Sequence, residues 1–396
     1  MNADRPVAPG IVAVLGRELS RLVGGWYLPV LVLVLPLLSF ALVWAIFAAG
    51  VPRHLPMAVV DGDHSALSRQ LVRMVDATPS LRVASMCADV ESARRLVRQD
   101  RVYGIVVVPE GLERDVRRGE APKVVAYYNA QYLLPASLIR RDLRAAVATL
   151  SAGFELEARE ARGDMPRAAL AHVEPIRVDS HTLFNPQLSY LYYLAAALLP
   201  SLLQIFVTVG TVHVLGVELK DGTAGAWLET AGGSVWRAVV GKVLPLTVHF
   251  SVLGLFMLAL LFHSMGVPMR GHLPVLIAAT VLFVVAYQAV ALAMVAWTAN
   301  LRFAASITAL YCAPAFAFVG ITFPTIGMPP MGRVWGEILP LTHYLRVLVD
   351  QALRGSAPAF SMPSLGALAL FAVIPSCVSM WRIKEVAASP KYWGRL

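Results

Sequence analysis

Few residues in this sequence have the types and spacing that catalysis or metal binding requires. Asp61, Asp63 and His64 place two carboxylates and an imidazole within four residues, a set that can bind a divalent metal ion. The same residues form a turn signal just before a helical pattern, and a turn with a helix N-cap is the simpler interpretation. We therefore predict no metal site. The chain has no G-x-G-x-x-G, P-loop or G-x-S-x-G motif, so we predict no catalytic residue. Its three cysteines, Cys87, Cys312 and Cys377, are not clustered.

Two groups of charged residues could bind a ligand or one another. The first is a basic cluster that could bind an anionic ligand, and its members are Arg94, Arg95, Arg98 and Arg101. A solvated helix face is the simpler interpretation of this cluster. Farther along, Arg346, Asp350 and Arg354 are spaced i, i+4, i+8, so one carboxylate can pair with two guanidinium groups.

Polar residues inside apolar stretches are candidates for lining a conduit. Gln204, Thr208 and Thr211 share one helical face, and His249 and Gln288 lie in later stretches. Hydrogen bonding between helices explains such residues equally well. No Asp, Glu, Lys or Arg lies in the middle of these stretches, so a proton or sodium relay lacks its usual groups. An energy source outside this chain is therefore favoured.

The elements that must position these residues belong to a membrane protein. The chain has 396 residues, of which 57% are hydrophobic and only 15% charged, against roughly 25% in soluble domains. Long uncharged stretches predict a polytopic α-helical membrane protein with six spans. We place them at Tyr27–Ala49, Leu188–Leu215, Val243–Phe262, Pro274–Trp297, Phe303–Phe323 and Pro363–Trp381.

Residues 51–186 have the composition of a soluble α/β domain inserted after the first span at 25–50. Strands are expected at Met57–Val60, Leu81–Ser85, Tyr103–Val108 and Val124–Tyr128. Helices are expected at Ser65–Val75, at Asp89–Arg98 with Asp89 as N-cap, at Leu112–Val116 and at Ala136–Arg162, the last ending at Gly163. Before the first span, residues 1–24 have the pattern of an amphipathic helix in the membrane interface, with a charged lead-in as the alternative.

The distribution of basic residues predicts the orientation in the membrane. Eleven lie in short segments on the side of the termini, and four lie in the short loops opposite, namely Arg270, Arg333, Arg346 and Arg354. The positive-inside rule then places both termini in the cytosol and residues 51–186 outside. The net charge of +9 does not indicate a nucleic-acid binder, because the inserted domain has 19 basic against 17 acidic residues.

Two segments outside the spans are unusual. Val217–Lys242 (in the five-span part, 187–396) is a short polar stretch rich in Gly and Thr, which this orientation places on the cytosolic face. Residues 324–358 contain four prolines before a helical run at Thr342–Leu353. This second segment is too apolar for an ordinary outer loop, so we predict short re-entrant helices, with a loosely packed surface loop as the alternative.

This order of elements resembles the permease subunit of a type-two ABC exporter, in the multidrug-type branch with a domain between spans one and two. The resemblance covers nearly the whole chain and depends on Phe184-Asn185-Pro186, Glu218, Gly222-Thr223, Leu228, Thr230, Gly241-Lys242, Gly320, Phe323-Pro324 and Pro340. It implies that the loop after span two is a coupling helix resting on a separate ATPase. It also implies a dimer of permeases, and ATP and Mg bound by the partner ATPase, with no cofactor in this chain. A periplasmic adaptor and an outer-membrane channel are further candidate partners.

The expected function is a permease that moves a hydrophobic or amphiphilic substrate out across the bacterial inner membrane. The residues expected to couple it to the ATPase are Glu218, Lys220, Asp221, Gly222, Thr223 and Glu229. The family usually has acidic residues where this chain has Lys220 and Gly225, which leaves Glu218, Asp221 and Glu229 for polar contact with the ATPase. Without a Walker motif the chain is not expected to be an enzyme. The alternative is a membrane-anchored receptor or assembly factor whose α/β domain binds a ligand or partner protein.

Overall fold

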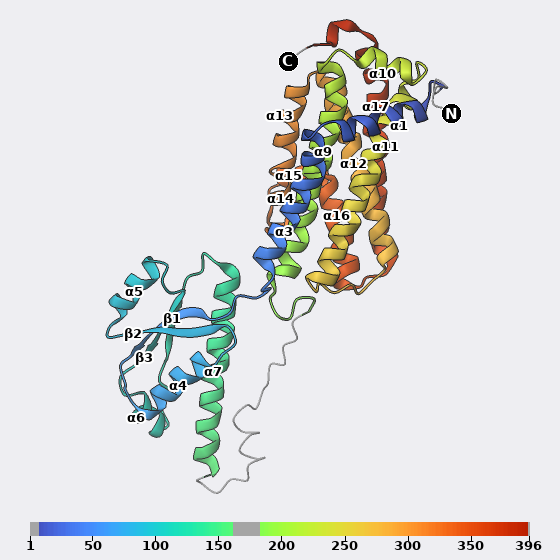
Figure 1. The fold of residues 1–396 in the computed structure, drawn as a ribbon. Helices are drawn as coiled ribbons and strands as arrows, with labels where there is room; N and C mark the ends of the chain where they lie inside the picture. Colours follow the sequence, from blue (N-terminus) through green and yellow to red (C-terminus); the bar gives the residue numbers. More distant parts are fainter. Residues whose placement is uncertain (1–7, 161–182, 395–396) are drawn as a thin grey trace, which may run out of the picture. The chain divides into compact units, whose positions relative to one another are not determined.

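The computed structural model describes residues 8–160 and 183–394, and the chain divides into two compact units (Figure 1). Unit 1 comprises Met1–Ala48 and Ser189–Leu396, and unit 2 comprises Ala49–Leu188. The expected end of the long helix at Arg162 and Gly163 lies outside the described residues.

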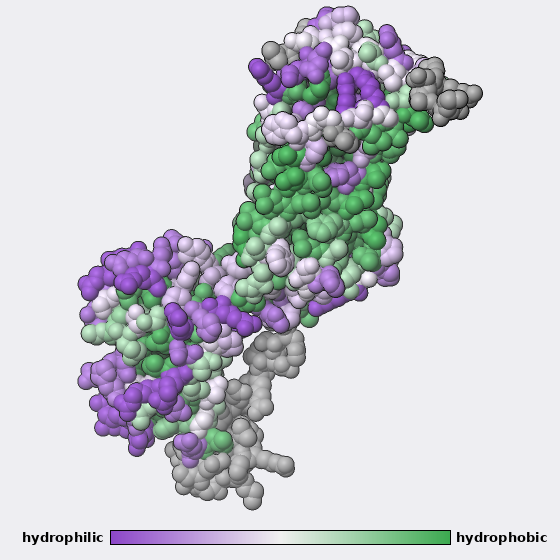
Figure 2. All heavy atoms as spheres, viewed as in Figure 1, coloured by the Kyte–Doolittle hydropathy of each residue, from purple (hydrophilic) through white to green (hydrophobic). Residues whose placement is uncertain are grey.

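Unit 1 is a bundle of long apolar helices. Within the described residues, six helices are long and apolar enough to cross a membrane: Tyr27–Phe47, Leu191–Lys220, Val235–Ser264, Leu273–Thr298, Leu301–Phe318 and Pro358–Ala388. In Figure 1 they carry the labels α3 (Leu35–Phe47), α9 (Ala196–Lys220), α11 (Val235–Ala259), α12 (Leu273–Thr298), α13 (Leu301–Cys312) with α14 (Ala315–Phe318), and α17 (Pro358–Ala388). Figure 2 shows apolar side chains in a band around the middle of this unit, with polar side chains at both ends. All six expected spans therefore form.

The first span contains a π-helical turn, Val30–Val34, between its two prolines Pro29 and Pro36. Pro36 has no N–H, so it cannot bond the carbonyl four residues earlier, which is that of Val32. His249 Nε2 of α11 lies 2.8 Å from this oxygen, close enough to donate a hydrogen bond to it. A neighbouring helix thus satisfies the carbonyl that the proline leaves free, as apolar surroundings require.

We expect His249→Leu to lower the free energy of unfolding by about 1 to 3 kcal/mol, because the Val32 carbonyl then has no partner. Thermal unfolding of the purified protein in detergent measures the loss. His263→Leu is the matched control, since His263 is exposed at the end of the same long helix. An equal loss in both variants would contradict this role for His249.

Unit 2 is built on a mixed four-stranded sheet with the order β2-β1-β3-β4. The strands are β1 (Leu55–Asp61), β2 (Leu81–Cys87), β3 (Gly104–Val108) and β4 (Val125–Tyr128). β1 is parallel to β2 and β3, and β4 is antiparallel to β3. All four strands form where the sequence predicts them.

Alternate residues of the strands supply the cores of unit 2 on both faces of the sheet. Met57 and Val59 pack toward α4 (Ala66–Asp76), α6 (Leu112–Arg117) and α7 (Leu133–Glu160). Ala58 and Val60 pack toward α5 (Val90–Arg98) on the other face. As expected, Asp89 caps α5 by accepting a hydrogen bond from the Ser92 N–H at 2.7 Å, and this bond holds the pKa of Asp89 below its ordinary value.

The turn at Asp61–His64 has the structural role expected of it. Asp61 Oδ1 accepts the N–H groups of Asp63 and His64, both at 3.0 Å, and Asp63 Oδ2 accepts the N–H of Glu113 at 3.1 Å. These carboxylates are therefore occupied by backbone donors. In the described residues, no group of three or more His, Cys, Asp or Glu could hold a metal ion.

The proline-rich segment of unit 1 forms short helices: α15 (Pro330–Glu337), α16 (Pro340–Leu348) and a π-helical turn at Val349–Arg354. α16 is almost wholly buried, so protein covers its backbone. The expected double pairing of Asp350 is wrong. Asp350 pairs with Arg354 at 2.9 Å, but Arg346 bonds both carboxylate oxygens of Glu337. The chain bend before Pro340 brings α15 back to α16, and Arg346 then holds the pKa of Glu337 below its ordinary value.

Candidate functional site

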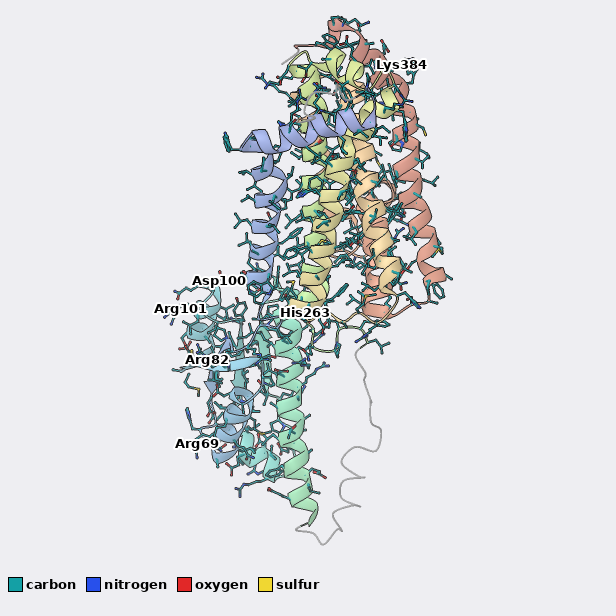
Figure 3. The ribbon with its side chains drawn as sticks, turned by 45° about the vertical axis from the view of Figure 1, so that its right-hand side comes forward. Arg69, Arg82, Asp100, Arg101, His263 and Lys384 are labelled. Carbon is teal, nitrogen blue, oxygen red and sulfur yellow. The ribbon has the colours of Figure 1, made fainter. Side chains whose placement is uncertain are left out.

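Four elements meet at the end of unit 1 where both chain termini lie, here called the terminal end (Figure 1). α9 ends at Lys220, the short helix α10 spans Ala224–Thr230, and α11 begins at Val235 with Ser234 as its N-cap. The fourth element, α1 (Ile11–Gly24), lies across the long helices. In Figure 3, Lys384 marks the terminal end and His263 marks the opposite end. The polar stretch Val217–Lys242 is thus mostly helical.

A partly buried group of charges joins these elements. We call Arg17, Glu18, Arg21, Glu218 and Lys242 the ionic cluster. Glu218 at its centre is fully buried, and its carboxylate accepts hydrogen bonds from Arg17 Nη2 at 3.0 Å, from Lys242 Nζ at 2.8 Å and from Arg21 Nη1. Lys242 Nζ also donates to Glu18 Oε1 at 2.7 Å. The cluster therefore fastens α1 to the end of α9 and to the start of α11.

Burial makes these pairs important for the local structure. Glu218 and Lys242 are both 1% exposed or less, so each needs the other to offset the loss of water. The Thr223 hydroxyl adds a further hydrogen bond to Glu218, from the residue that precedes α10. The start of α10 is consequently linked to the same carboxylate as α1 and α11.

Trp227 anchors α10 itself. Its side chain is 1% exposed, and its Nε1 donates a hydrogen bond to the Ala238 carbonyl of α11 at 3.1 Å. Lys242 Nζ lies 5.5 Å from the centre of the Trp227 ring, within range of a cation–π interaction. The anchor of α10 is therefore in direct contact with the ionic cluster.

Both ends of the chain also hold this region, one through the end of α10 and the other through the end of α9. The Gly10 N–H bonds the Thr230 carbonyl, and the Gly394 N–H bonds the Leu219 carbonyl, both at 2.9 Å. A Cβ on Gly225 would lie 2.8 Å from the Trp393 ring. The space that an acidic side chain would need at position 225 is thus filled by Trp393.

α1 crosses α11 at Gly241, where no side chain has room. A Cβ there would lie 2.9 Å from Val14 Cβ and 3.0 Å from the Ile11 carbonyl oxygen. We expect Gly241→Val to push α1 away, to cost about 1 to 3 kcal/mol, and to speed tryptic cleavage after Arg17 and Arg21, whose side chains are 20% and 37% exposed. The rate of tryptic cleavage of the folded protein measures this.

Gly16→Ala is the control for this experiment. A Cβ on Gly16 meets nothing within 4 Å, so alanine there should leave α1 in place and stabilise the helix by about 0.5 to 1 kcal/mol. Equal protection of α1 in Gly241→Val and in the unsubstituted protein would show that the close crossing does not hold it.

The residues expected to touch a partner fall into two classes. Lys220, Asp221 and Glu229 are exposed at the terminal end. Glu218 is not exposed, because its carboxylate is buried among cations of its own chain, and its contact with an ATPase stays a prediction. Gly222 occupies the left-handed turn (φ 68°) between α9 and α10. The sequence reasoning missed Glu18 and Trp227, although an acid between two arginines on an amphipathic helix was an available signal.

The candidate conduit residues Gln204, Thr208 and Thr211 are fully buried and bond within the chain. Gln204 Nε2 donates to the Cys312 carbonyl at 3.2 Å, and its Oε1 accepts from the Tyr287 hydroxyl. Both threonine hydroxyls donate to carbonyls of the preceding turn of α9. Gln204 thus bonds between helices, whereas the two threonine hydroxyls bond within α9.

The other two conduit candidates lie elsewhere. His249 contacts the first span, as described above. Gln288 lines a hollow of about 180 Å³ between α11, α12 and α17, where its Oε1 accepts a hydrogen bond from Thr247 at 2.8 Å. Gln288 Nε2 is buried without a partner among the described residues. Gln288 is thus a conduit candidate with a free hydrogen-bond donor beside an apolar hollow.

Comparison with known proteins adds one match. A family model described as ABC-2 family transporter protein matches residues 26–381. A search of curated proteins finds no match. The matched region begins with the first span, includes the whole of unit 2 and ends in α17.

Proposed function

Because this chain belongs to the ABC-2 transporter family and is a multi-pass membrane component of an ABC transporter, we propose that it is the permease of an ATP-driven exporter. In this proposal the terminal end faces the cytosol and α10 is a coupling helix that rests on a separate ATPase subunit. Two copies of the permease, or one copy and a paralogue, form the pathway, and unit 2 lies outside the membrane. The ATPase subunits bind ATP and Mg, and a periplasmic adaptor with an outer-membrane channel completes the assembly.

The observation that carries this proposal is the attachment of α10 to the ionic cluster. α10 exposes Glu229 to solvent while Trp227 and Thr223 tie its other face to α11 and Glu218. A displacement of α10 would therefore move α1, α9 and α11 together, since buried ion pairs resist separation. Such rigid linkage is what the transmission of force from an ATPase to the spans requires.

The orientation is supported by charge. Basic residues gather in the short segments at the terminal end, which include Lys220, Arg237 and Lys384, whereas few lie in the short loops opposite. The positive-inside rule then favours a cytosolic terminal end. An ATPase in the cytosol would meet Lys220, Asp221 and Glu229, the exposed charges next to and on α10.

The nature of the cargo is supported by the hollow at Gln288. Its walls are mostly apolar, contributed by residues such as Val243, Leu292 and Met380, and Gln288 offers one amide donor. A hydrophobic or amphiphilic molecule with a hydrogen-bond acceptor matches this lining. We propose export of such a substrate out of the cell across the inner membrane.

The test is reconstitution with an ABC ATPase subunit encoded in the same genome. We expect the two proteins to purify together, and ATP hydrolysis in lipid nanodiscs to rise when amphiphilic compounds are added. Glu229→Arg, on the exposed face of α10, should weaken the association without altering the thermal stability of the permease alone. A permease that binds no ATPase, and whose unit 2 instead retains a ligand or partner protein, would favour a membrane-anchored receptor and overturn the proposal.

A further inference from the structure

The outer edge of β4 in unit 2 has backbone groups free to pair with another strand. The Asn129 N–H bonds the Tyr103 carbonyl at 2.8 Å, and the register pairs Ile105 with Tyr127 and Val107 with Val125. In an antiparallel pair these bonded positions alternate with non-bonded ones. The N–H and C=O groups of Ala126 and Tyr128 therefore point away from β3. Within the described residues no strand pairs with this edge.

The two faces of the sheet beside this edge are hollowed, and the two hollows differ in chemistry. On the α5 face, a hollow of about 630 Å³ is lined by Arg94 and Arg98 together with Tyr127 and Tyr128. Both arginines lie near one carboxylate only, that of Glu91, at 3.7 and 3.5 Å. The wall of this hollow thus carries two arginines against one lining acid, Asp100, and Arg94 lies 5.7 Å from the centre of the exposed Tyr127 ring.

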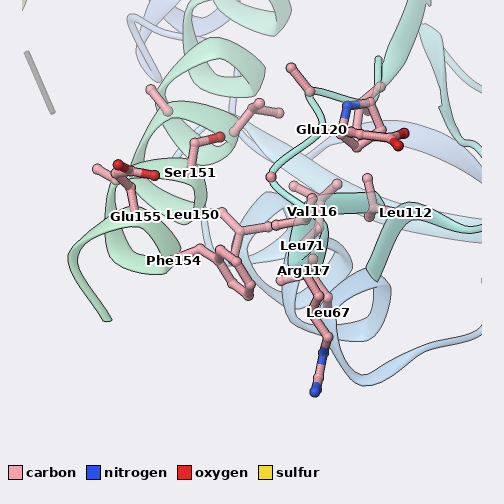
Figure 4. A pocket seen from close by; sticks show the side chains of 17 residues that line it. Leu67, Leu71, Leu112, Val116, Arg117, Glu120, Leu150, Ser151, Phe154 and Glu155 are labelled. Carbon is pink, nitrogen blue, oxygen red and sulfur yellow. The ribbon is translucent and has the colours of Figure 1, made fainter. Parts of the chain in front are cut away.

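On the α7 face, a hollow of about 460 Å³ is lined mainly by apolar side chains, including Val106, Ala126, Leu143 and Val147. It shares lining residues with a larger hollow of about 670 Å³ between α4, α6 and α7, whose walls Figure 4 shows. In that view Leu150 and Phe154 lie on one wall, and Leu71 and Val116 lie on the other. The apolar hollow beside β4 therefore adjoins a larger hollow with a mixed lining.

From this arrangement we infer that unit 2 binds an extended segment of a partner protein, which adds as a strand to the outer edge of β4. Successive side chains of a strand point to opposite faces. Such a segment would place every second side chain toward Arg94 and Arg98 and the others toward Leu143 and Val147. The chemistry that matches both faces is an alternation of acidic and apolar residues. Backbone bonds to Ala126 and Tyr128 supply affinity, and the two hollows supply selectivity.

This inference concerns unit 2 alone and goes beyond transport. The test uses the full chain in lipid nanodiscs and fluorescent peptides of about nine residues, long enough for one strand. One peptide alternates Val and Glu, and a second has the same composition in two blocks. We expect the alternating peptide to bind at least about tenfold more tightly, as measured by fluorescence anisotropy.

Changes to the backbone test strand addition directly. Ala126→Pro removes the outward N–H but no bond to β3, so it should weaken binding by at least about tenfold, whereas Ala126→Val should not. N-methylation of the peptide on the amides that face β4 should abolish binding, and N-methylation on the opposite edge should leave it unchanged. This pair of peptides leaves the protein unaltered, so it decides the question even if Ala126→Pro unfolds unit 2.

Charge reversal tests the α5 face. Arg94→Glu together with Arg98→Glu should weaken binding of the Val/Glu peptide and strengthen that of a Val/Lys peptide. Equal binding of the alternating and block peptides, binding that survives N-methylation of either edge, or no binding at all would overturn the inference. Dimers of the chain that dissociate in Ala126→Pro, without peptide binding, would overturn it in favour of pairing between two copies.

Discussion

Glu218→Gln is expected to abolish cargo-stimulated ATP hydrolysis by the assembled transporter and to lower the free energy of unfolding by about 3 to 5 kcal/mol. The substituted amide would keep the shape of the side chain but remove the charge that Arg17, Arg21 and Lys242 share. Those cations would remain close together, with Glu18 as the one acid left in the ionic cluster. The link from α10 to α1 and α11 would then weaken. ATPase assays in nanodiscs and denaturant titration in mixed micelles measure the two effects.

A matched control and a rescue distinguish the cluster from general damage. Glu229→Gln removes an exposed carboxylate from α10 and should leave the unfolding free energy within about 0.5 kcal/mol. The double variant Lys242→Met, Glu218→Gln should lose less stability than the sum of the losses of the two single variants. Each single variant leaves a buried charge without its partner, whereas the double variant removes both charges of the pair. Strict additivity, or a Glu218→Gln protein as stable as the unsubstituted one, would refute the account of the cluster.

Trp227→Ala is expected to be comparably damaging, with a loss of about 3 to 5 kcal/mol and loss of coupling to the ATPase. The substitution removes the largest fully buried side chain of α10, its hydrogen bond to the Ala238 carbonyl and its contact with Lys242. α10 would then be held mainly by the backbone bond from Gly10 to the Thr230 carbonyl and by the bond from the Thr223 hydroxyl to Glu218. Hydrogen exchange of the α10 amides should rise, and this rise measures the detachment of the helix.

Trp236→Ala is the control for this experiment. Trp236 lies near the start of α11 but is 59% exposed, so its removal leaves no buried cavity. Hydrogen exchange in α10 should be unchanged in this variant. If both tryptophan variants loosened α10 equally, the anchoring role of Trp227 would be excluded.

Trp227→Phe separates packing from hydrogen bonding at the same position. Phenylalanine keeps most of the buried ring but cannot donate to the Ala238 carbonyl. We expect it to recover a large part of the stability that Trp227→Ala loses, and to leave a deficit of about 0.5 to 1.5 kcal/mol from the lost hydrogen bond.

The features that sequence reasoning captured are local. Each span was predicted because an uncharged run long enough to cross a bilayer is a property of its own residues, and all six occur. The strands of unit 2 were predicted for a similar reason, since period-two patterning and turn residues lie within a few positions of one another. Asp89 was identified as an N-cap because the cap and the first turn of α5 are adjacent.

The features that sequence reasoning missed depend on residues that are far apart in the chain. Glu218 was expected to contact a partner protein, yet its bonds go to Arg17 and Arg21, which precede it by 201 and 197 positions. Arg346 was expected to pair with Asp350, yet a bend in the chain brings it to Glu337. For Arg346 the i, i+4 spacing favoured a nearer charge, but the bend in the chain supplied a different partner.

The sequence by itself thus determined that this chain crosses the membrane, where its spans lie, and that an α/β unit is inserted after the first. These properties follow from the transfer of individual segments from water to an apolar medium, which depends on each segment's own composition. Only the tertiary structure decided that Glu218, near the end of α9, is buried rather than exposed to solvent, and that Trp227 anchors α10. A buried charge takes whichever opposite charge the fold brings to it, and that choice is made by packing between distant segments.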